Sequence, residues 1–338
     1  MYSCPSIALL PMLPIPADLI VVFVGHDLIG DGVMKLPFLR VLRQTYPKAR
    51  ILWLATGKSV FASTLSPLVE NLLDAVIEDA VVGGSWLDLL RPPVSLPRAD
   101  LLIDTQRRVP TSLALCRLRP RHFVSAAAGW RLSTLRPVDR SKPPAMLAQM
   151  LLLLEACGAK PNLANLPPLH LPSAVETEAA RRLPSGASLV GLAPGAGGRH
   201  KCWPLSRFLA VGRTLAGRGI RPVMLLGPAE QEWRQPVESE LPDALLPLRV
   251  DDSPLMTIAI ARRLSVTVAN DSGTGHLVAA AGTKLISLFG PTAPEKFAPA
   301  SPGLILIRAQ DFGATEMAAI PEEAVLARVA EALPAGPP

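Results

Sequence analysis

The chain has 338 residues, enough for about two domains, of which 49% are hydrophobic and 18% are charged. Its longest apolar runs are far shorter than the roughly 20 residues of a bilayer helix, and its four cysteines show no Cys-x-x-Cys spacing, which argues against a membrane span, a disulfide framework and a structural zinc site. The formal net charge of +6 favours an anionic partner, but 4% aromatic residues and the lack of a recognisable motif argue against nucleic acid.

Residues 1–17 are apolar but contain four prolines and no basic stretch. The helical core of a signal peptide would not readily accept these prolines. We therefore expect a flexible or surface-draped leader on a cytoplasmic protein.

The first predicted domain, residues 18–160, alternates apolar strands with helices. Residues 18–25 form a continuous apolar run ending in glycine, which is typical of a buried parallel strand. A turn with Gly30 and Asp31 follows, and then a helix through residues 36–45. The glycines do not have Gly-x-Gly-x-x-Gly spacing, so the dinucleotide fingerprint is absent. Further strands are predicted at residues 50–55, 75–77, 100–104 and 122–125, and a long helix at 141–158.

Asp31 stands where this first turn becomes a helix. Its carboxylate could cap the helix N-terminus, or it could project into a cleft at the carboxyl end of the first strand. A helix cap and a cleft carboxylate are compatible roles for Asp31, and the sequence gives equal support to each.

A strongly basic segment spans residues 107–142. Three interpretations are open: a plain solvated face, a surface for an acidic glycolipid or membrane, or a nucleic-acid surface, the last being the weakest. The segment contains one acid, Asp139, against Arg107, Arg108, Arg117, Arg119, Arg121, Arg131, Arg136, Arg140 and Lys142.

A proline-rich stretch at residues 160–172 indicates a linker, which we place at 161–185. The alternating pattern then restarts in a second domain, residues 186–320, and residues 321–338 form a last amphipathic helix and a tail. Strands are predicted at 188–193, 222–226, 244–248, 265–269, 284–289 and 304–307. Two parallel-sheet α/β domains with a cleft between them are the economical architecture.

Two glycine turns in the second domain suit phosphate. The loop 195–201 combines glycine N–H groups with Arg199 and Lys201 before a helix, although it lacks the P-loop spacing. The other turn, residues 270–276, links an apolar strand to an apolar helix that Asp271 or Ser272 could cap. Backbone N–H groups and the helix dipole at this second turn favour an anion.

Acidic side chains at Glu230 and Glu232 follow another predicted strand and suit a ribose diol, although acids also favour helix N-termini in general. Because parallel strands present their carboxyl ends at one edge, these acids and both glycine turns should share it. That combination predicts a nucleoside-diphosphate site. A carboxylate facing it from Asp31 suggests general-base chemistry at an atom attached to the diphosphate.

The order and spacing of five motifs resemble glycosyltransferase family 9, the ADP-heptose:lipopolysaccharide heptosyltransferases. The resemblance runs from residue 18 onward, and its specific part is the pair Lys-x-Trp-Pro and Asp-Ser-Gly-x-x-His. The motifs are Gly30-Asp31…Leu36-Pro37, Ile103-Asp104-Thr105-Gln106, Lys201-x-Trp203-Pro204, Asp271-Ser272-Gly273-x-x-His276-Leu277 and Phe289-Gly290-Pro291-Thr292.

The resemblance implies a GT-B fold of two Rossmann-like domains, with the C-terminal helix crossing back towards the first. It implies that Asp31 is the general base for the acceptor hydroxyl and that Lys201 neutralises the departing diphosphate. Donor-binding groups would be Gly197, Arg199, Asp271, Ser272, Gly273, His276 and either Glu230 or Glu232, with Gly30, Gln106 and Arg107 on the acceptor side.

The predicted function is inverting transfer of a heptose or related sugar from an ADP-activated donor, with no obligatory metal or cofactor. The acceptor would be a lipopolysaccharide core or another anionic glycolipid at the inner-membrane surface. The enzyme would be a monomer that associates peripherally with this surface. A sugar-nucleotide epimerase on the same scaffold and a non-catalytic nucleotide-sugar-binding protein are the alternatives. Ala196 and Gly197 stand where the family often has hydroxyl residues, so backbone N–H groups or Arg199 would replace those contacts.

Overall fold

The computed structural model describes residues 13–82, 96–183, 188–301 and 303–333. Most of the predicted leader, residues 1–12, therefore lies outside the described residues. Within the remainder, the Ile15 N–H donates to the Cys157 carbonyl at 3.0 Å, so this part of the chain lies along the first domain.

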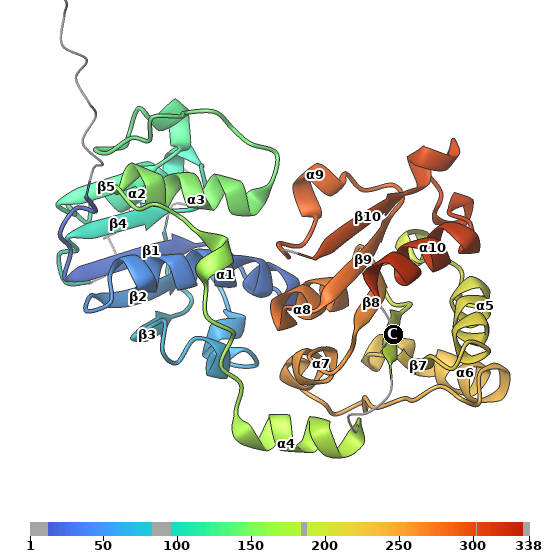
Figure 1. The fold of residues 1–338 in the computed structure, drawn as a ribbon. Helices are drawn as coiled ribbons and strands as arrows, with labels where there is room; N and C mark the ends of the chain where they lie inside the picture. The colour runs from blue at the N-terminus through green and yellow to red at the C-terminus, as the bar shows by residue number, and fades with distance from the viewer. Residues whose placement is uncertain (1–12, 83–95, 184–187, 302, 334–338) are drawn as a thin grey trace, which may run out of the picture.

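Two five-stranded sheets form the centres of two α/β domains (Figure 1). The first sheet has the order β3-β2-β1-β4-β5 and the second the order β10-β9-β8-β6-β7, and all neighbouring strands are parallel. The strands are β1 Leu19–Val24, β2 Arg50–Ala55, β3 Ala75–Ile77, β4 Leu101–Asp104, β5 His122–Ser125, β6 Leu189–Ala193, β7 Arg221–Met224, β8 Val266–Asn270, β9 Lys284–Phe289 and β10 Leu304–Arg308.

Helices cover both sheets (Figure 1). The α-helices are α1 Ile29–Thr45, α2 Val109–Cys116, α3 Met146–Ala156, α4 Ser173–Arg182, α5 Leu205–Ala216, α6 Arg234–Glu240, α7 Pro254–Ala261, α8 Gly273–Ala281, α9 Pro294–Phe297 and α10 Glu322–Ala332. Short 3₁₀ helices occur at Val60–Ala62, Ser66–Leu68, Ala127–Trp130, Leu163–Asn165, Arg199–Lys201, Pro228–Trp233, Ala309–Phe312 and Met317–Ala319.

The central strands are buried on both faces, which explains their unbroken apolar sequences. In β1 every residue from Ile20 to Val24 is at most 1% exposed. One apolar cluster continues from the first domain through α3 and the linker to α7 and α8 of the second. The two domains therefore share apolar packing, in addition to having their own cores.

The strand order places the β1–α1 and β8–α8 turns where ligands bind in open parallel sheets. In each sheet the order in which successive strands are added reverses beside the central strand, and ligands bind in the crevice outside the carboxyl ends of the strands at that point. The α1 and α8 N-termini also meet across the domain boundary: a Cβ built on Gly30 would lie 3.9 Å from the Gly273 Cα.

Two sequence-based elements differ from the structure because of proline. The helix predicted at 141–158 begins only at Met146, since Pro143 and Pro144 hold the preceding residues out of the helical region. The strand predicted at 244–248 is wrong: Leu245 makes a single bridge to Val223, and Pro247 cannot donate to a ladder.

The chain ends also differ from the prediction. The helix α10 packs against α5 and strands β8, β9 and β10, so the described part of the predicted segment, up to residue 333, stays on the second domain, and residues 334–338 lie outside the described residues. Its apolar residues Val325 and Val329 are buried in the second domain's core. The predicted linker 161–185 includes α4, which packs against α7 of the second domain.

Candidate active site

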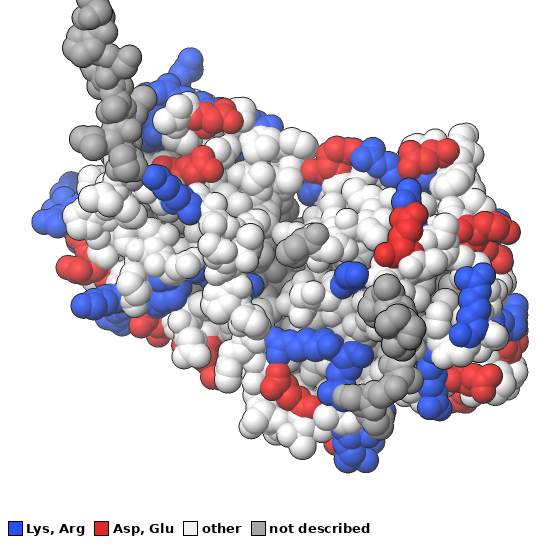
Figure 2. Space-filling view, viewed as in Figure 1, with Lys and Arg blue, Asp and Glu red and all other residues white. Residues whose placement is uncertain are grey.

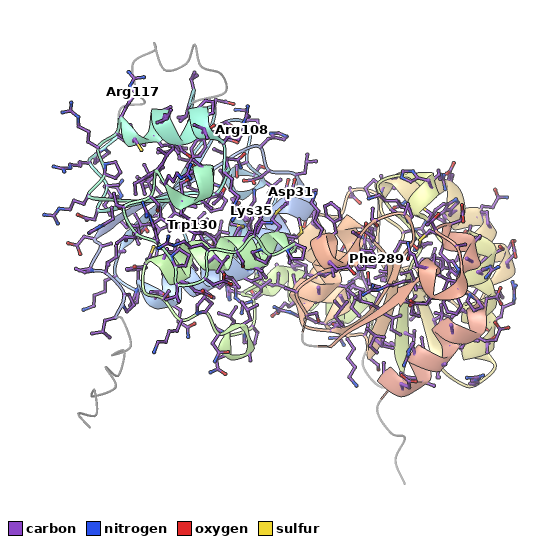
Figure 3. The ribbon with its side chains drawn as sticks, turned by 90° about the horizontal axis from the view of Figure 1, so that it is seen from above. Asp31, Lys35, Arg108, Arg117, Trp130 and Phe289 are labelled. Atoms are coloured by element: carbon purple, nitrogen blue, oxygen red, sulfur yellow. The ribbon has the colours of Figure 1, made fainter. Side chains whose placement is uncertain are left out.

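Asp31 lies in the first turn of α1, two residues after the helix begins. The N-cap is Leu28, and its N–H donates to Asp31 Oδ2 at 3.4 Å. Asp31 is thus not the N-cap residue: it accepts the N-cap N–H from the third helical position, and Leu28 has no polar side chain to return the bond. Its carboxylate remains partly exposed, and Figure 3 shows it at the edge of the first domain that faces the second.

A buried network that the sequence analysis missed supports this turn. Asp27, 2% exposed, accepts hydrogen bonds from the Trp53 indole at 3.1 Å and the Ser59 hydroxyl at 3.2 Å, and it pairs with Lys35. Lys35 is on α1, one turn after Asp31. The signal in the sequence was a lysine within the otherwise apolar core-facing stretch of this helix. The ion pair fixes the β1–α1 turn to the first turns of α1.

The predicted phosphate turn has the expected geometry. Ser272 is the N-cap of α8, and its hydroxyl accepts the Gly275 N–H at 3.2 Å. Asp271 instead accepts the Thr292 hydroxyl at 2.7 Å and the Lys201 ammonium at 3.4 Å. The loops after β6, β8 and β9 therefore bring a lysine, a carboxylate and a helix N-terminus to one place.

Asn270 fastens these loops together, and the sequence analysis did not identify it as important. It is fully buried at the end of β8; its Oδ1 accepts the Trp203 N–H at 3.0 Å, and its Nδ2 donates to the Pro194 carbonyl at 2.7 Å. These bonds tie both ends of the glycine loop to the second turn. Lys201 is thereby held beside Asp271.

His276 is 8% exposed and lies one turn into α8. Burial lowers the pKa of its imidazole below the ordinary value, while the negative charges of Asp271 and Asp31 act in the opposite direction. The imidazole is therefore mainly neutral at pH 7, with one nitrogen able to donate and the other able to accept. The imidazole is thus under the electrostatic influence of one carboxylate from each domain.

Arg199 does not point freely into the glycine loop. Its guanidinium lies 4.4 Å from the centre of the Trp233 ring and pairs with Glu232, whose side chain is 59% exposed. Gly197, by contrast, is open: a Cβ built there meets nothing within 4 Å. The loop thus offers its backbone and Lys201 to a ligand, while Arg199 and Glu232 occupy its outer edge.

Glu230 lies against the inside of the same loop. Its carboxylate accepts the Gly227 N–H at 2.9 Å, and a Cβ on Gly195 would stand only 2.3 Å from its Oε1. Burial raises the pKa of Glu230, although the Gly227 N–H and the positive charge of Arg199 counteract this. Of the two acids that the sequence left open, Glu230 is the one inside the cleft edge.

On the first domain, Asp104 organises the predicted acceptor side. It is fully buried, accepts the hydroxyls of Ser112 and Ser125 at 2.5 and 2.8 Å, and accepts the Gln106 N–H at 2.9 Å. Burial raises the pKa of Asp104. The Gln106 side chain lies over Gly25, where a Cβ would be 2.9 Å from Oε1.

Arg107, the residue after Gln106, has a left-handed backbone with φ 57°. Its guanidinium donates to the Gln149 side chain at 2.9 Å. This places Arg107 between the end of β4 and α3. Not every basic residue of the segment 107–142 lies near Asp31, since Figure 3 shows Arg117 at the outer side of the first domain, far from Asp31.

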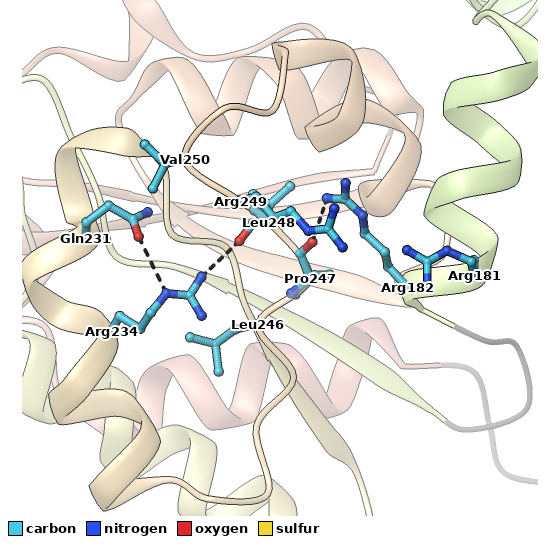
Figure 4. A pocket seen from close by; sticks show the side chains of 9 residues that line it. All are labelled: Arg181, Arg182, Gln231, Arg234, Leu246, Pro247, Leu248, Arg249 and Val250. Atoms are coloured by element: carbon cyan, nitrogen blue, oxygen red, sulfur yellow. Dashed lines mark hydrogen bonds between the residues drawn. The ribbon is translucent and has the colours of Figure 1, made fainter.

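An arginine-lined hollow of about 480 Å³ on the second domain is separate from these groups (Figure 4). Its lining includes Arg181, Arg182, Arg234 and Arg249, and none of the predicted site residues. Much of this charge is already compensated, because Arg182 pairs with Glu178 and Asp252.

Taken together, the approach of the α1 and α8 N-termini brings a partly exposed carboxylate of the first domain towards a lysine, a neutral histidine and a helix N-terminus of the second. Such a set can accept a proton from a hydroxyl and stabilise charge on a departing diphosphate. Across the described ranges, no cluster of three or more His, Cys, Asp or Glu side chains is arranged to hold a metal ion. No helix of the described residues is long and apolar enough to span a bilayer.

Comparisons with known proteins identify the family of the chain. The model of glycosyltransferase family 9 (heptosyltransferase) matches residues 96–322. The chain is 25% identical to lipopolysaccharide heptosyltransferase 2 of Salmonella typhimurium over 85% of this chain and 87% of the relative. It is 24% identical to the Escherichia coli enzyme of the same name, over the same shares.

Solved structures show the same fold. The glycosyltransferase family 9 protein of Veillonella parvula superposes with a TM-score of 0.70 at 19% identity, covering 95% of this chain and 98% of that one. The Escherichia coli heptosyltransferase WaaC with ADP gives 0.67 at 19% identity, covering 93% and 99%. These similarities show a GT-B fold, and the family match shows more: the chain belongs to glycosyltransferase family 9, the heptosyltransferase family, and is a glycosyltransferase.

Proposed function

We propose that this enzyme transfers a heptose from ADP-heptose, with inversion, to a hydroxyl of an anionic lipopolysaccharide-core acceptor. The observation that carries the proposal is the placement of the Asp31 carboxylate opposite Lys201, His276 and the α8 N-terminus. Heptose transfer in lipopolysaccharide synthesis follows from the family, and a solved relative, WaaC of Escherichia coli, was crystallised with ADP.

In this mechanism Asp31 takes the proton of the acceptor hydroxyl as its oxygen attacks the anomeric carbon of the donor. The bond between that carbon and the diphosphate oxygen breaks on the opposite face, which inverts the configuration. Lys201 and the N–H groups of Ser272 and Gly273 stabilise the negative charge that develops on ADP. Asp271 holds Lys201 in position, and its 3.4 Å contact leaves the ammonium able to turn towards phosphate.

Glu230 binds the ribose hydroxyls in this proposal, and Glu232 does not. The choice of Glu230 is supported by its half-buried position against Gly195, whereas Glu232 is exposed and paired with Arg199. His276 contacts the donor sugar or its phosphate as a neutral imidazole. The positive charge required by the leaving group is supplied by Lys201 and the helix N-terminus, so we propose that no metal is obligatory.

The acceptor site lies on the first domain, next to Gly30, Gln106 and Arg107. We propose that the acceptor is an anionic glycolipid met at the inner face of the inner membrane by a peripheral, cytoplasmic monomer. Support comes from the net charge of +6 and from the position of Arg107 at the end of β4. No observation favours the epimerase or the non-catalytic alternative over glycosyl transfer, which is the activity of the family.

The decisive experiment replaces Asp31 with asparagine, which keeps the shape and the Leu28 contact but cannot accept the proton in the same way. We expect kcat to fall by about 10²–10⁴ while the Kd for ADP changes less than about twofold. If kcat falls less than tenfold, Asp31 is not the base.

The donor is tested by thermal shift with ADP, GDP and UDP. At a hundredfold excess over its Kd, ADP should stabilise the fold by about 2.7 kcal/mol. A shift with UDP but none with ADP would refute the donor assignment. Turnover that disappears in EDTA and returns with a divalent cation would refute the metal-independent mechanism, and an isomerised donor formed without acceptor would favour the epimerase.

A further inference from the structure

A second cavity, of about 810 Å³, lies between the two domains beside the proposed active site. Its walls are α1, the start of α3, α8, the linker segment 163–169 and residues 296–301. In Figure 2 the surface is hollowed between the domains, and charged side chains are nearly absent there. The size lies within the range of small-molecule sites, which is about 300–1,000 Å³.

The lining of this cavity is mainly aliphatic. It includes Val33, Leu36 and Pro37 of α1, Ala280 of α8 and Leu166 of the linker. Because the residues at 33, 36, 37 and 40 follow the helical repeat, they form one face of α1 that looks into the cavity. An apolar chain would find continuous apolar contact along this face.

Arg40 is the exception on this face of α1. It lines the cavity and is partly buried, and burial lowers the pKa of its guanidinium, which nevertheless stays charged at pH 7. Among the described residues, none makes a hydrogen bond or ion pair with the Arg40 guanidinium. The arginine three residues further along the same helix, Arg43, makes an ion pair with Asp74 at 2.7 Å and donates to two backbone carbonyls.

The other charged groups at the cavity do not neutralise Arg40. Lys296 lines the second domain's side, with its ammonium 4.9 Å from the centre of the Phe297 ring. His276 is buried, with its pKa lowered by burial, and none of the described residues that line the cavity is acidic. A partly buried cation without a counter-ion in an apolar site costs free energy, which an anionic ligand would recover.

We propose that this cavity binds a single-chain anionic amphiphile. Its head group would lie between Arg40 and Lys296, and its hydrocarbon chain would lie along α1 and α8 towards His276. Such an occupant would contact both domains at once. Arg40 and Lys296, the two charged groups that carry the proposal, lie outside the phosphate turns, and the cavity meets the proposed donor site only at His276.

Binding is measured by calorimetry on the full chain, with three probes below their aggregation concentrations. Dodecyl phosphate has both a hydrocarbon chain and an anionic charge. Dodecyl maltoside has the chain without the charge, and inorganic phosphate has the charge without the chain. We expect one saturable site for dodecyl phosphate, at least tenfold tighter than for dodecyl maltoside, and no measurable binding of inorganic phosphate under the same conditions.

Two variants locate the site. Arg40→Met keeps the apolar stem and removes the charge, and it should weaken dodecyl phosphate at least tenfold while leaving dodecyl maltoside unchanged. Ala280→Phe fills the cavity and should weaken both amphiphiles. Arg249→Met, in the separate arginine-lined hollow, is the matched control and should bind dodecyl phosphate like the parent protein.

Thermal stabilisation by ADP shows whether each variant is folded. The proposal is overturned if Arg40→Met binds dodecyl phosphate as tightly as the parent, if dodecyl maltoside binds equally well, or if inorganic phosphate competes at similar concentration. It is also overturned if Arg249→Met loses binding to the same extent as Arg40→Met. If Arg40→Met does not fold, Ala280→Phe decides: unchanged binding there refutes the site.

Discussion

At the scale of single residues, the site depends on buried polar groups that the ligand does not need to touch. Asp27 and Lys35 form an ion pair with side-chain exposures of 0% and 8%. Removing one partner of such a pair leaves a buried charge without compensation, which typically costs about 3–5 kcal/mol. The pair thus stabilises the turn before Asp31 only as long as both members are present.

We therefore expect Lys35→Met to lower the free energy of unfolding by about 3–5 kcal/mol, measured as the first transition in urea. Lys58→Met is the matched control, because Lys58 pairs with Asp79 and Glu78 while 72% exposed, and its loss should lower the free energy of unfolding far less. Equal losses in the two variants would show that the buried pair has no special role.

His276 predicts a pH dependence of stability. Because burial lowers its pKa in the folded state, the unfolded chain binds the proton more readily, and stability is lost as the pH falls. The loss begins near the unfolded value of about 6.5 and is complete below the lowered folded value. Unfolding free energies of the parent protein and His276→Gln, measured between pH 8 and 5, should therefore converge as the pH falls.

The direction in which stability changes with pH distinguishes His276 from Asp104 and Glu230. Asp104 and Glu230 have raised pKa values, so their effect is opposite: stability is lost as the pH rises through their folded pKa values. Asp104 and Glu230 are present in both the parent protein and His276→Gln. Their contribution therefore cancels when the unfolding free energies of the two proteins are subtracted. A difference that does not change with pH would contradict the burial of the imidazole.

At the scale of elements, the cleft edge is built by loops whose contacts lie far apart in sequence. The sequence predicted the glycine loop and the Ser272 cap, because glycine turns and N-caps are local patterns. It could not predict that Arg199 stacks on Trp233, or that Asn270 joins Pro194 to Trp203. Those contacts depend on how three separate βα loops pack, which no local spacing reveals.

The close packing of Gly195 on Glu230 gives a test of that loop. In Gly195→Ala the new Cβ would stand 2.3 Å from Glu230 Oε1, so the carboxylate must leave its position. If Glu230 binds the ribose, the Kd for ADP should rise at least tenfold. Gly197→Ala, where the Cβ meets nothing within 4 Å, should raise it much less. Similar values for the two variants would argue against ribose binding by Glu230.

The strands themselves were predictable. Ten of the predicted strands are confirmed to within two residues at each end, because a strand buried on both faces has a continuous apolar sequence between turn residues. The exception, 244–248, has the same apolar pattern but contains Pro247. Because proline has no backbone N–H to donate to a sheet, its presence argues for a connecting segment at 244–248 instead of a strand.

At the scale of the whole molecule, the sequence predicted two domains and the family, but not how closely the domains meet. The resemblance implied a C-terminal helix crossing to the first domain, whereas α10 stays on the second. The contact between domains is instead made by α1 against α8 and by an apolar cluster running through the linker. Such an interface is set by tertiary packing, and the sequence pattern of either helix alone does not identify its partner.

The Gly30 and Gly273 contact tests whether this approach matters for catalysis. A Cβ on Gly30 would lie 3.9 Å from the Gly273 Cα, an ordinary van der Waals distance, so Gly30→Ala should be accepted and should slightly favour α1. Gly30→Leu adds three further carbons beyond that Cβ, which can reach towards the second domain and should push the helix N-termini apart. Asp31 would then stand too far from the donor, because a displacement of about 1 Å can cost about 10²-fold in rate.

For Gly30→Leu we therefore expect kcat to fall at least a hundredfold while the Kd for ADP stays within about threefold, since the donor groups belong to the second domain. Gly30→Ala should keep kcat within about threefold of the parent value. A parallel loss of ADP affinity would mean that the leucine disturbs the second domain itself. Equal kcat values for the two variants would mean that the spacing of α1 and α8 does not set the distance between base and donor.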